Sequence, residues 1–264
     1  MLEVIRRLGI FPHTCVLELT LRCNFRCRHC GSHAGQPRPE ELSTEEWLRI
    51  CDELVELHCE RVTLSGGEPT MHPDWALIGK SLADRGVCVN VVSNGSLWTD
   101  EVTRQAMAAG LNNVGFSLDG LAATHDEWRA FPGSFERIMA ALASCRRHHF
   151  RSSVVTVLNR RNIAELRELR ALLAERGVRW WQCQLGTPSG ELRQHPEWLL
   201  NAEDLLEVVP LLAELRAMPG RPHLVLTDNV GYYGKYEAAI RKSPASWGFW
   251  MGCRAGLQTI GIES

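Results

Sequence analysis

Long hydrophobic runs are missing from this 264-residue sequence. No stretch approaches the roughly 20 apolar residues that cross a bilayer. The first 15 residues also lack the apolar core and the small-residue cleavage site of a secretory signal. We therefore expect a cytoplasmic protein without a membrane partner.

An excess of either charge is missing as well. The 29 Lys and Arg residues are balanced by 31 Asp and Glu residues, and the net charge is -2. A protein this close to neutral offers no global field for nucleic acid or for an anionic membrane. We expect no nucleic-acid partner, and we expect a local site to select what the protein binds.

No fourth cysteine accompanies the three that lie close together at Cys23, Cys27 and Cys30. The ten cysteines do not resemble a secreted disulfide framework, so this C-x3-C-x2-C group indicates metal binding. Structural zinc needs four ligands, and His29 or His33 would have to supply the fourth from almost the same loop. Iron–sulfur clusters bind cysteine thiolates, and three of them leave one iron of a four-iron cluster open. An open position suits a catalyst, and a zinc or electron-transfer site remains the alternative.

Short apolar segments alternate with amphipathic helical patterns from residue 14 to about 217. Ser43, with Glu46 three positions later, has the pattern of a helix N-terminal capping box. Gly86 and Gly110 stand where helices are expected to end. The expected strands span 15–21, 61–65, 88–93, 112–118, 152–159 and 178–185, and the expected helices span 43–57, 74–86, 100–110, 162–177 and 201–218.

Six strands that alternate with helices predict an α/β fold with parallel pairing, either a doubly wound sheet or a barrel. The near-continuous apolar strands indicate burial on both faces of the sheet. After residue 220 the sequence becomes rich in glycine and aromatic residues, and the alternation stops. We divide the chain into a lead-in at 1–12, a main domain at 13–220 and a C-terminal segment at 221–264.

Three further motifs follow the ends of successive expected strands: SGGEP at 65–69, VVSNG at 91–95 and GFSLDG at 115–120. Together with the C-x3-C-x2-C loop, they resemble the signature of the radical S-adenosylmethionine (SAM) superfamily, over residues 13 to about 190. The resemblance implies a partial (β/α)6 TIM-like barrel with its site at the C-terminal strand ends. It also implies one 4Fe-4S cluster on Cys23, Cys27 and Cys30, with an open iron that binds SAM.

The same resemblance implies which residues contact SAM. His29 would lie near the adenine, at a position where the family usually has an aromatic residue. Backbone groups of Gly66 and Gly67 and the carboxylate of Glu68 would receive the methionine ammonium. The other implied contacts are Ser93 and Asn94 near the ribose, Ser117 and Asp119 facing SAM, and Arg129 on the SAM carboxylate.

Strand six places Gln182 and Gln184 on one face, opposite Trp181 and Cys183. We expect the two glutamines to lie near the cofactor or the substrate. Cys183 is interpreted as a packed small hydrophobic residue, with a radical-quenching thiol as the alternative.

The stretch GCRAGLQTIGIES at 252–264 resembles the opening of the SPASM or twitch extension that follows many radical SAM barrels. In that extension a cysteine begins an auxiliary iron–sulfur site and a hairpin follows, so Cys253 would be the first auxiliary ligand. Either the extension is cut short at Ser264 or Cys253 is a vestige. We expect no auxiliary cluster in the chain as printed, and one is possible only if the chain continues.

The implied activity is reductive cleavage of SAM to a 5'-deoxyadenosyl radical, which takes a hydrogen atom from a substrate. Because SPASM-type enzymes commonly modify peptides, the first hypothesis is an oxidoreductase-type maturase of a ribosomally made peptide or a protein side chain. The second is a radical SAM enzyme that acts on a small metabolite or cofactor precursor. The third is a non-catalytic iron–sulfur or zinc protein. The implied partners are a peptide or small-molecule substrate and an electron donor such as flavodoxin or ferredoxin.

Overall fold

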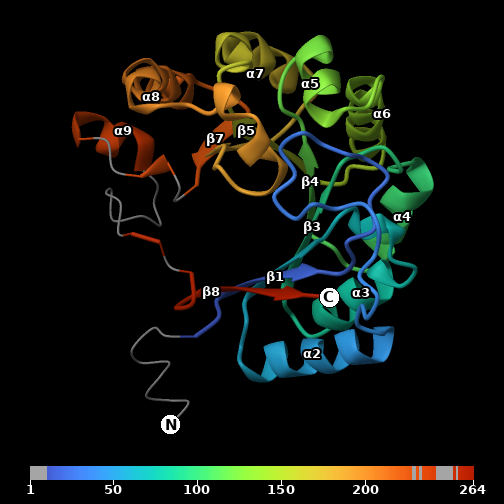
Figure 1. Cartoon of the computed structure of the whole chain (residues 1–264). Helices are drawn as coiled ribbons and strands as arrows, with labels where there is room; N and C mark the ends of the chain where they lie inside the picture. Colours follow the sequence, from blue (N-terminus) through green and yellow to red (C-terminus); the bar gives the residue numbers. More distant parts are fainter. Residues whose placement is uncertain (1–10, 228–229, 232–233, 242–251, 254) are drawn as a thin grey trace.

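The computed structural model describes residues 11–227, 230–231, 234–241, 252–253 and 255–264. In this part of the chain, eight parallel strands form one sheet that curls into a half-barrel, with helices on its outer side (Figure 1). The predicted α/β fold with a partial parallel barrel is therefore confirmed.

The sheet follows the chain order across its centre. Strands β1 to β6 lie side by side in sequence order, as is common for consecutive β/α units. Two further strands were not predicted: β7 lies beside β6 and β8 lies beside β1. The strands are β1 (Thr14–Glu18), β2 (Arg61–Ser65), β3 (Cys88–Ser93), β4 (Asn113–Ser117), β5 (Ser152–Leu158), β6 (Trp180–Leu185), β7 (His223–Leu226) and β8 (Thr259–Glu263).

Helices connect the strands, and their ends follow the expected capping chemistry. The Ser43 side chain accepts from the Glu46 backbone N–H, and the Glu46 carboxylate accepts from the Ser43 backbone N–H, which confirms the predicted capping box. The helices are α2 (Thr44–Glu56), α3 (Trp75–Ala83), α4 (Asp100–Ala108), α5 (Ala122–Arg129), α6 (Ser134–Arg147), α7 (Leu166–Glu175), α8 (Ala202–Ala217) and α9 (Glu237–Arg241). Between β4 and β5 the chain forms two helices, α5 and α6, and the first of them reaches the candidate site.

The main hydrophobic core lies between the sheet and its helices. Alternate strand residues such as Leu17, Leu64 and Val91 are completely buried there, as are Trp47 and Ile78 of α2 and α3. Fully burying a side chain of this size stabilises the fold by about 1.5–3 kcal/mol. The intervening strand residues face the inside of the half-barrel, so this packing determines which side chains reach the interior.

The segment after residue 220 supplies both edge strands. β8 pairs in parallel with β1, from Thr14 opposite Thr259 to Glu18 opposite Glu263. Residues 260–262 therefore belong to the barrel sheet, whereas the resemblance to the C-terminal extension implied a hairpin. Arg38 ties this edge together, because its guanidinium lies 2.5 Å from the Glu18 carboxylate and donates to the Ser264 hydroxyl at 2.9 Å. The boundary near residue 220 stays a prediction.

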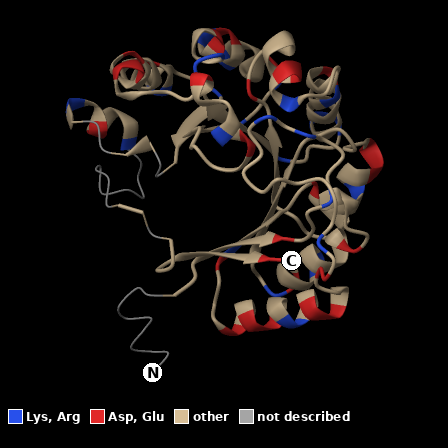
Figure 2. Cartoon of the chain, viewed as in Figure 1, with Lys and Arg blue, Asp and Glu red and all other residues tan. Residues whose placement is uncertain are grey.

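Charged residues are concentrated on the helices and loops (Figure 2). The strands are mostly uncharged, which suits a sheet covered by helices on one face and enclosing an interior on the other. Among the described residues, the structure contains no helix with the length and apolar character that a bilayer crossing requires.

Candidate functional site

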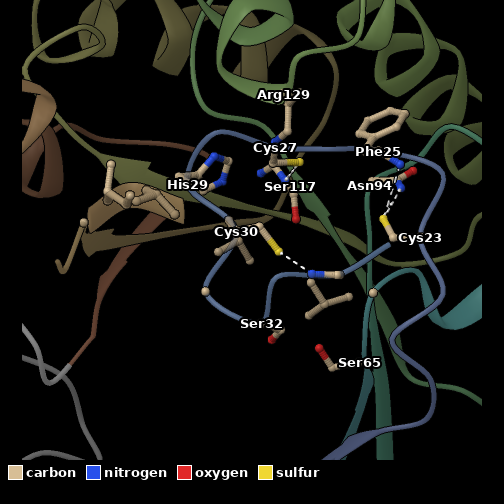
Figure 3. Close-up of a pocket in the computed structure, with 18 of the residues that line it drawn as sticks. Cys23, Phe25, Cys27, His29, Cys30, Ser32, Ser65, Asn94, Ser117 and Arg129 are labelled. Atoms are coloured by element: carbon tan, nitrogen blue, oxygen red, sulfur yellow. Dashed lines mark hydrogen bonds between the residues drawn. The ribbon is translucent and has the colours of Figure 1, made fainter. Parts of the chain in front are cut away.

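A cavity of about 390 Å³ lies at the C-terminal ends of the strands (Figure 3). Residues from the loops after β1, β2, β3 and β4 meet in its wall, as the half-barrel geometry requires. The predicted site residues in this wall are Cys23, Cys27, His29, Cys30, Gly66, Gly67, Ser93, Asn94, Ser117 and Arg129. Glu68 and Asp119 are completely buried behind it.

The cysteine loop is closed at its base by backbone pairing. The Cys23 N–H donates to the Gly35 carbonyl at 3.1 Å, and the Gly35 N–H donates to the Leu21 carbonyl at 2.8 Å. The Arg26 guanidinium then spans the loop and donates to the Cys23 and Phe25 carbonyls at 2.8 and 2.7 Å. A Cβ on Gly35 would lie 2.7 Å from that guanidinium, so Gly35 leaves the space in which Arg26 packs.

Each of the three thiols accepts from a nitrogen donor (Figure 3). The Phe25 N–H donates to Cys23 Sγ at 3.4 Å, and the Ala34 N–H donates to Cys30 Sγ at 3.3 Å. Cys27 Sγ differs, because its donor is Nη1 of the Arg129 guanidinium, at 3.8 Å. The first two donors are neutral backbone groups, whereas the third is a cation.

The donor set fits an iron–sulfur cluster better than a single metal ion. Among the described residues, no three His, Cys, Asp or Glu side chains come close enough to hold one metal ion, although the three thiols line the same cavity. This spacing counts against the zinc alternative, whereas a cluster presents a separate iron to each thiolate. Burial raises the pKa of Cys23 to about 11 and also raises the pKa of Cys27. Binding of iron would therefore displace protons from these thiols.

Gly66 and Gly67 bring the loop after β2 against the start of the cysteine loop. The Gly67 N–H donates to the Thr20 carbonyl at 2.7 Å. A Cβ on Gly66 or Gly67 would lie 2.4 Å from the carbonyl oxygen of Thr20 or Arg22, respectively. These glycines are thus required by close backbone packing, in addition to any contact with a ligand.

Glu68 braces two strand ends from behind the cavity wall. Its carboxylate accepts from the Thr70 hydroxyl at 2.6 Å, from the Ser93 hydroxyl at 2.9 Å and from the Asn94 N–H at 2.8 Å. Burial, partly offset by these donors, raises the pKa of Glu68. Contact between Glu68 and the methionine ammonium stays a prediction.

Asn94 links the end of β3 to the cysteine loop. Its side-chain amide donates to Asn24 Oδ1 at 2.9 Å, and Asn24 in turn donates to the Ser96 hydroxyl at 2.7 Å. The sequence motif had identified Asn94 only as a ribose contact. The structure shows that it also holds the loop that carries the cysteines.

Asp119 and Arg129 form a buried ion pair beside the cysteine loop. Arg129 Nη2 lies 2.5 Å from Asp119 Oδ2, and the Asp119 and Arg129 side chains are 0% and 10% exposed. Asp119 Oδ1 accepts from the Val157 N–H at 2.8 Å, which anchors the pair to β5. His29 lies nearby, with its Nε2 3.7 Å from Asp119 Oδ2 and its ring stacked on Trp128. Burial and the Arg129 cation hold the pKa of His29 well below its usual value.

The loop after β6 forms a part of the site that was not predicted. Gln184 lines the cavity as expected, together with Thr187 and Ser189 of this loop, whereas Cys183 packs in the hydrophobic core. The Glu191 N–H donates to the Cys30 carbonyl at 2.9 Å. The run GTPSG at 186–190 follows a strand at the same rim, and this turn-forming composition was the available signal.

A parallel half-barrel with three cysteines on the loop after its first strand defines the class of barrel enzymes built around an iron–sulfur centre. The chain belongs to the radical SAM superfamily, because the sequence model of that superfamily matches residues 17–173. The family implies a 4Fe-4S cluster and SAM as cofactors, and it makes the protein an enzyme.

Curated relatives include enzymes with different substrates. The AdoMet-dependent heme synthase of Methanosarcina barkeri (strain Fusaro / DSM 804) is 34% identical over 181 residues, which are 68% of this chain and 52% of that protein. The mycofactocin maturase MftC of Mycobacterium tuberculosis (strain ATCC 25618 / H37Rv) is 36% identical over 163 residues, which are 61% of this chain and 41% of that protein. The chain thus spans about half the length of the curated relatives that it matches.

A crystal structure of Streptococcus suis SuiB bound to S-adenosylmethionine shares the fold. The TM-score is 0.79 at 14% sequence identity, and the match covers 99% of this chain and 61% of SuiB. At this identity the likeness concerns the fold alone.

Proposed function

We propose that the protein is a radical SAM enzyme that modifies a ribosomally made peptide or a protein side chain. The observation that carries the proposal is the meeting of three thiols with the motif residues of β2, β3 and β4 in one cavity. With its cofactors bound, such an enzyme cleaves SAM reductively and uses the 5'-deoxyadenosyl radical to take a hydrogen atom from the substrate.

Different residues of the cavity would have different roles in binding the cofactors and the substrate. Cys23, Cys27 and Cys30 would hold one 4Fe-4S cluster and leave one iron open to SAM. The loops with Gly66 and Asn94 would form the SAM side of the cavity, opposite β5 and β6. The protein's own contribution is positional, since it holds the reacting C–H near the radical and excludes water.

The cavity wall at β5 and β6 favours a peptide substrate. Val155 and Val157 provide apolar surface, while Gln184, Thr187 and Ser189 provide uncharged hydrogen-bonding groups. Such a wall suits an aliphatic or aromatic side chain flanked by backbone amides. The maturase relative MftC and the structural relative SuiB, which has been crystallised bound to its precursor peptide SuiA, support the same substrate class.

A small-molecule substrate is the second candidate, and the heme synthase relative favours it. Haem carries carboxylate groups, and a site for it needs cations to pair with them. Within the described cavity lining, Arg129 is the one charged side chain, and Asp119 already pairs with it. This charge balance supports a peptide substrate over a small-molecule substrate with several carboxylate groups.

The reaction needs a one-electron reductant, and we propose a flavodoxin-like or ferredoxin-like protein for this role. We propose a cytoplasmic location, where such low-potential donors are found. Cys253, which the resemblance assigns as the first auxiliary ligand, is exposed and forms no disulfide among the described residues.

Co-expression with any short peptide that is encoded beside its gene tests the proposed substrate class. The peptides are recovered anaerobically and measured by mass spectrometry, with the Cys30→Ala variant as the matched control. A mass change that needs Cys30 is the expected result. If no peptide changes while the wild-type protein still cleaves SAM to 5'-deoxyadenosine, the small-molecule hypothesis replaces this one.

A further inference from the structure

The C-terminal end of α5 delivers a cation to one cluster ligand. α5 ends at Arg129, and the next residue, Ala130, adopts a left-handed conformation with φ of 51°, which stops the helix. The Arg28 N–H donates to the Trp128 carbonyl at 3.1 Å, so the cysteine loop and the helix end are joined by backbone. This contact places the Arg129 guanidinium against the Cys27 sulfur, 3.8 Å from Nη1.

The guanidinium is fixed in that position from its other side. Its Nη2 is paired with Asp119, and Asp119 is anchored to the Val157 N–H of β5. Arg129 is only 8% exposed, so water screens its charge poorly. A guanidinium anchored by the buried Asp119 carboxylate keeps one geometry relative to Cys27.

We propose that Arg129 raises the reduction potential of the cluster by direct contact with the Cys27 thiolate. This inference rests on the proposed cluster ligands. A reduced cluster carries one more negative charge than an oxidised one, and a neighbouring cation stabilises the reduced form more. The negative charge of Asp119 has the opposite effect on the reduction potential. This effect is the smaller one, because Asp119 contacts the guanidinium, whereas the guanidinium itself contacts the sulfur.

The role differs from the implied contact between Arg129 and the SAM carboxylate, and the two roles can be separated. A contact with SAM has no effect until SAM binds. A contact with Cys27 acts on the cluster in the absence of SAM. The midpoint potential measured without SAM therefore reports the contact with Cys27 alone.

The experiment compares the reconstituted 264-residue chain with three variants. Arg129→Gln removes the cation and leaves Asp119 unpaired, whereas the double variant Arg129→Gln with Asp119→Asn removes both charges and protects the fold from an unpaired buried carboxylate. Arg129→Lys keeps the charge without the two-pronged geometry. Arg28→Gln is the control, because Arg28 is an exposed arginine of the same loop.

Midpoint potentials are measured by redox titration without SAM, followed by electron paramagnetic resonance. The potential should fall in Arg129→Gln, fall less in the double variant and least in Arg129→Lys, and Arg28→Gln should match the wild type. Potentials equal to that of the wild type in both Arg129→Gln and the double variant would overturn the inference while the cluster itself stands. Failure of the wild-type chain to assemble a 4Fe-4S cluster would instead contradict the proposed function.

Discussion

Buried polar side chains organise the rim of the cavity residue by residue. Glu68, Asn94 and Asp119 were identified from motifs as contacts of a ligand, and each also holds a neighbouring backbone segment or side chain. A motif shows which residue type is needed at a position. It does not show that a carboxylate receives three of its donors from Thr70, Ser93 and Asn94, because these partners depend on how the loops fold against one another.

Replacement of Glu68 by Gln tests the bracing role. The amide nitrogen of Gln cannot accept the hydrogen bonds that one carboxylate oxygen now accepts, and a buried donor left without a partner costs about 1–3 kcal/mol. We expect the free energy of unfolding to fall by this amount in urea denaturation, and SAM affinity to fall in calorimetric titration of the reconstituted protein.

Glu165→Gln provides the matched control for this variant. Glu165 accepts from the Leu121 N–H at 2.8 Å and from the Thr124 hydroxyl at 2.5 Å, and it is not part of the cavity lining. It should lose stability while SAM affinity is retained. A Glu68→Gln protein with wild-type stability would show that the observed hydrogen bonds do not brace the site.

At the scale of elements, a 3-10 helix after β6 holds the cysteine loop. This helix, η3, spans Gly190–Gln194 and begins where Gly190 has a positive φ of 53°. A Cβ on Gly190 would lie 2.1 Å from the Cys30 carbonyl oxygen. The His33 side chain also contacts the Glu191 carboxylate, with 2.6 Å between Nδ1 and Oε1. The loop after β6 thus fixes Cys30, the third of the proposed cluster ligands.

Gly190→Ala should therefore impair cluster assembly. We expect iron and sulfide content, and the absorbance of the 4Fe-4S centre, to fall by more than half after anaerobic reconstitution. Gly177→Ala separates this effect from backbone strain, because Gly177 also has a positive φ, of 77°, and has no described atom within 4 Å of its Cβ position. Equal cluster content in the two variants would show that η3 does not hold the cysteine loop in place.

Asp100 joins α4 to α6 at the outer layer. It accepts from the Ser144 hydroxyl at 2.5 Å and from Arg147 Nη2 at 2.7 Å. These two partners lower the pKa of Asp100 to about 2. A carboxyl whose pKa is lowered by folding adds stability above its unfolded pKa, and it loses this contribution as the pH falls toward its folded pKa.

The direction of this pKa shift predicts how the stability difference between the wild type and Asp100→Asn changes with pH. The wild type should have the higher melting temperature at pH 6, and the difference should shrink as the pH falls from about 4 to 2. Differential scanning calorimetry of the metal-free chain measures both curves. A difference that stays constant down to pH 2 would assign the effect to something other than ionisation of Asp100.

At the scale of the whole molecule, the local sequence pattern predicted the layered α/β arrangement. It did not predict the two strands that form the edges of the sheet. The alternation of apolar strand segments, such as 152–159, with amphipathic helical patterns predicted parallel β/α units, and the structure confirms them. The pairing of β8 with β1 joins residues about 245 positions apart. No local pattern contains such a contact, because it depends on the curl of the complete sheet.

The same distinction applies to the candidate site. Four motifs at successive strand ends could be placed on one rim from topology alone, and they meet in one cavity. The approach of Arg129 to Cys27 spans 102 positions and depends on where α5 stops, so the sequence motif could not indicate it.

Reductive cleavage of SAM tests most directly whether the three cysteines hold a cluster with an open iron. The 264-residue chain is reconstituted anaerobically with iron and sulfide, and it is then incubated with dithionite and SAM. Chromatography with mass spectrometry should detect 5'-deoxyadenosine and methionine in equal amounts, and neither should form with Cys23→Ala, Cys27→Ala or Cys30→Ala. A wild-type chain with a full 4Fe-4S cluster that produces no 5'-deoxyadenosine would contradict the assignment.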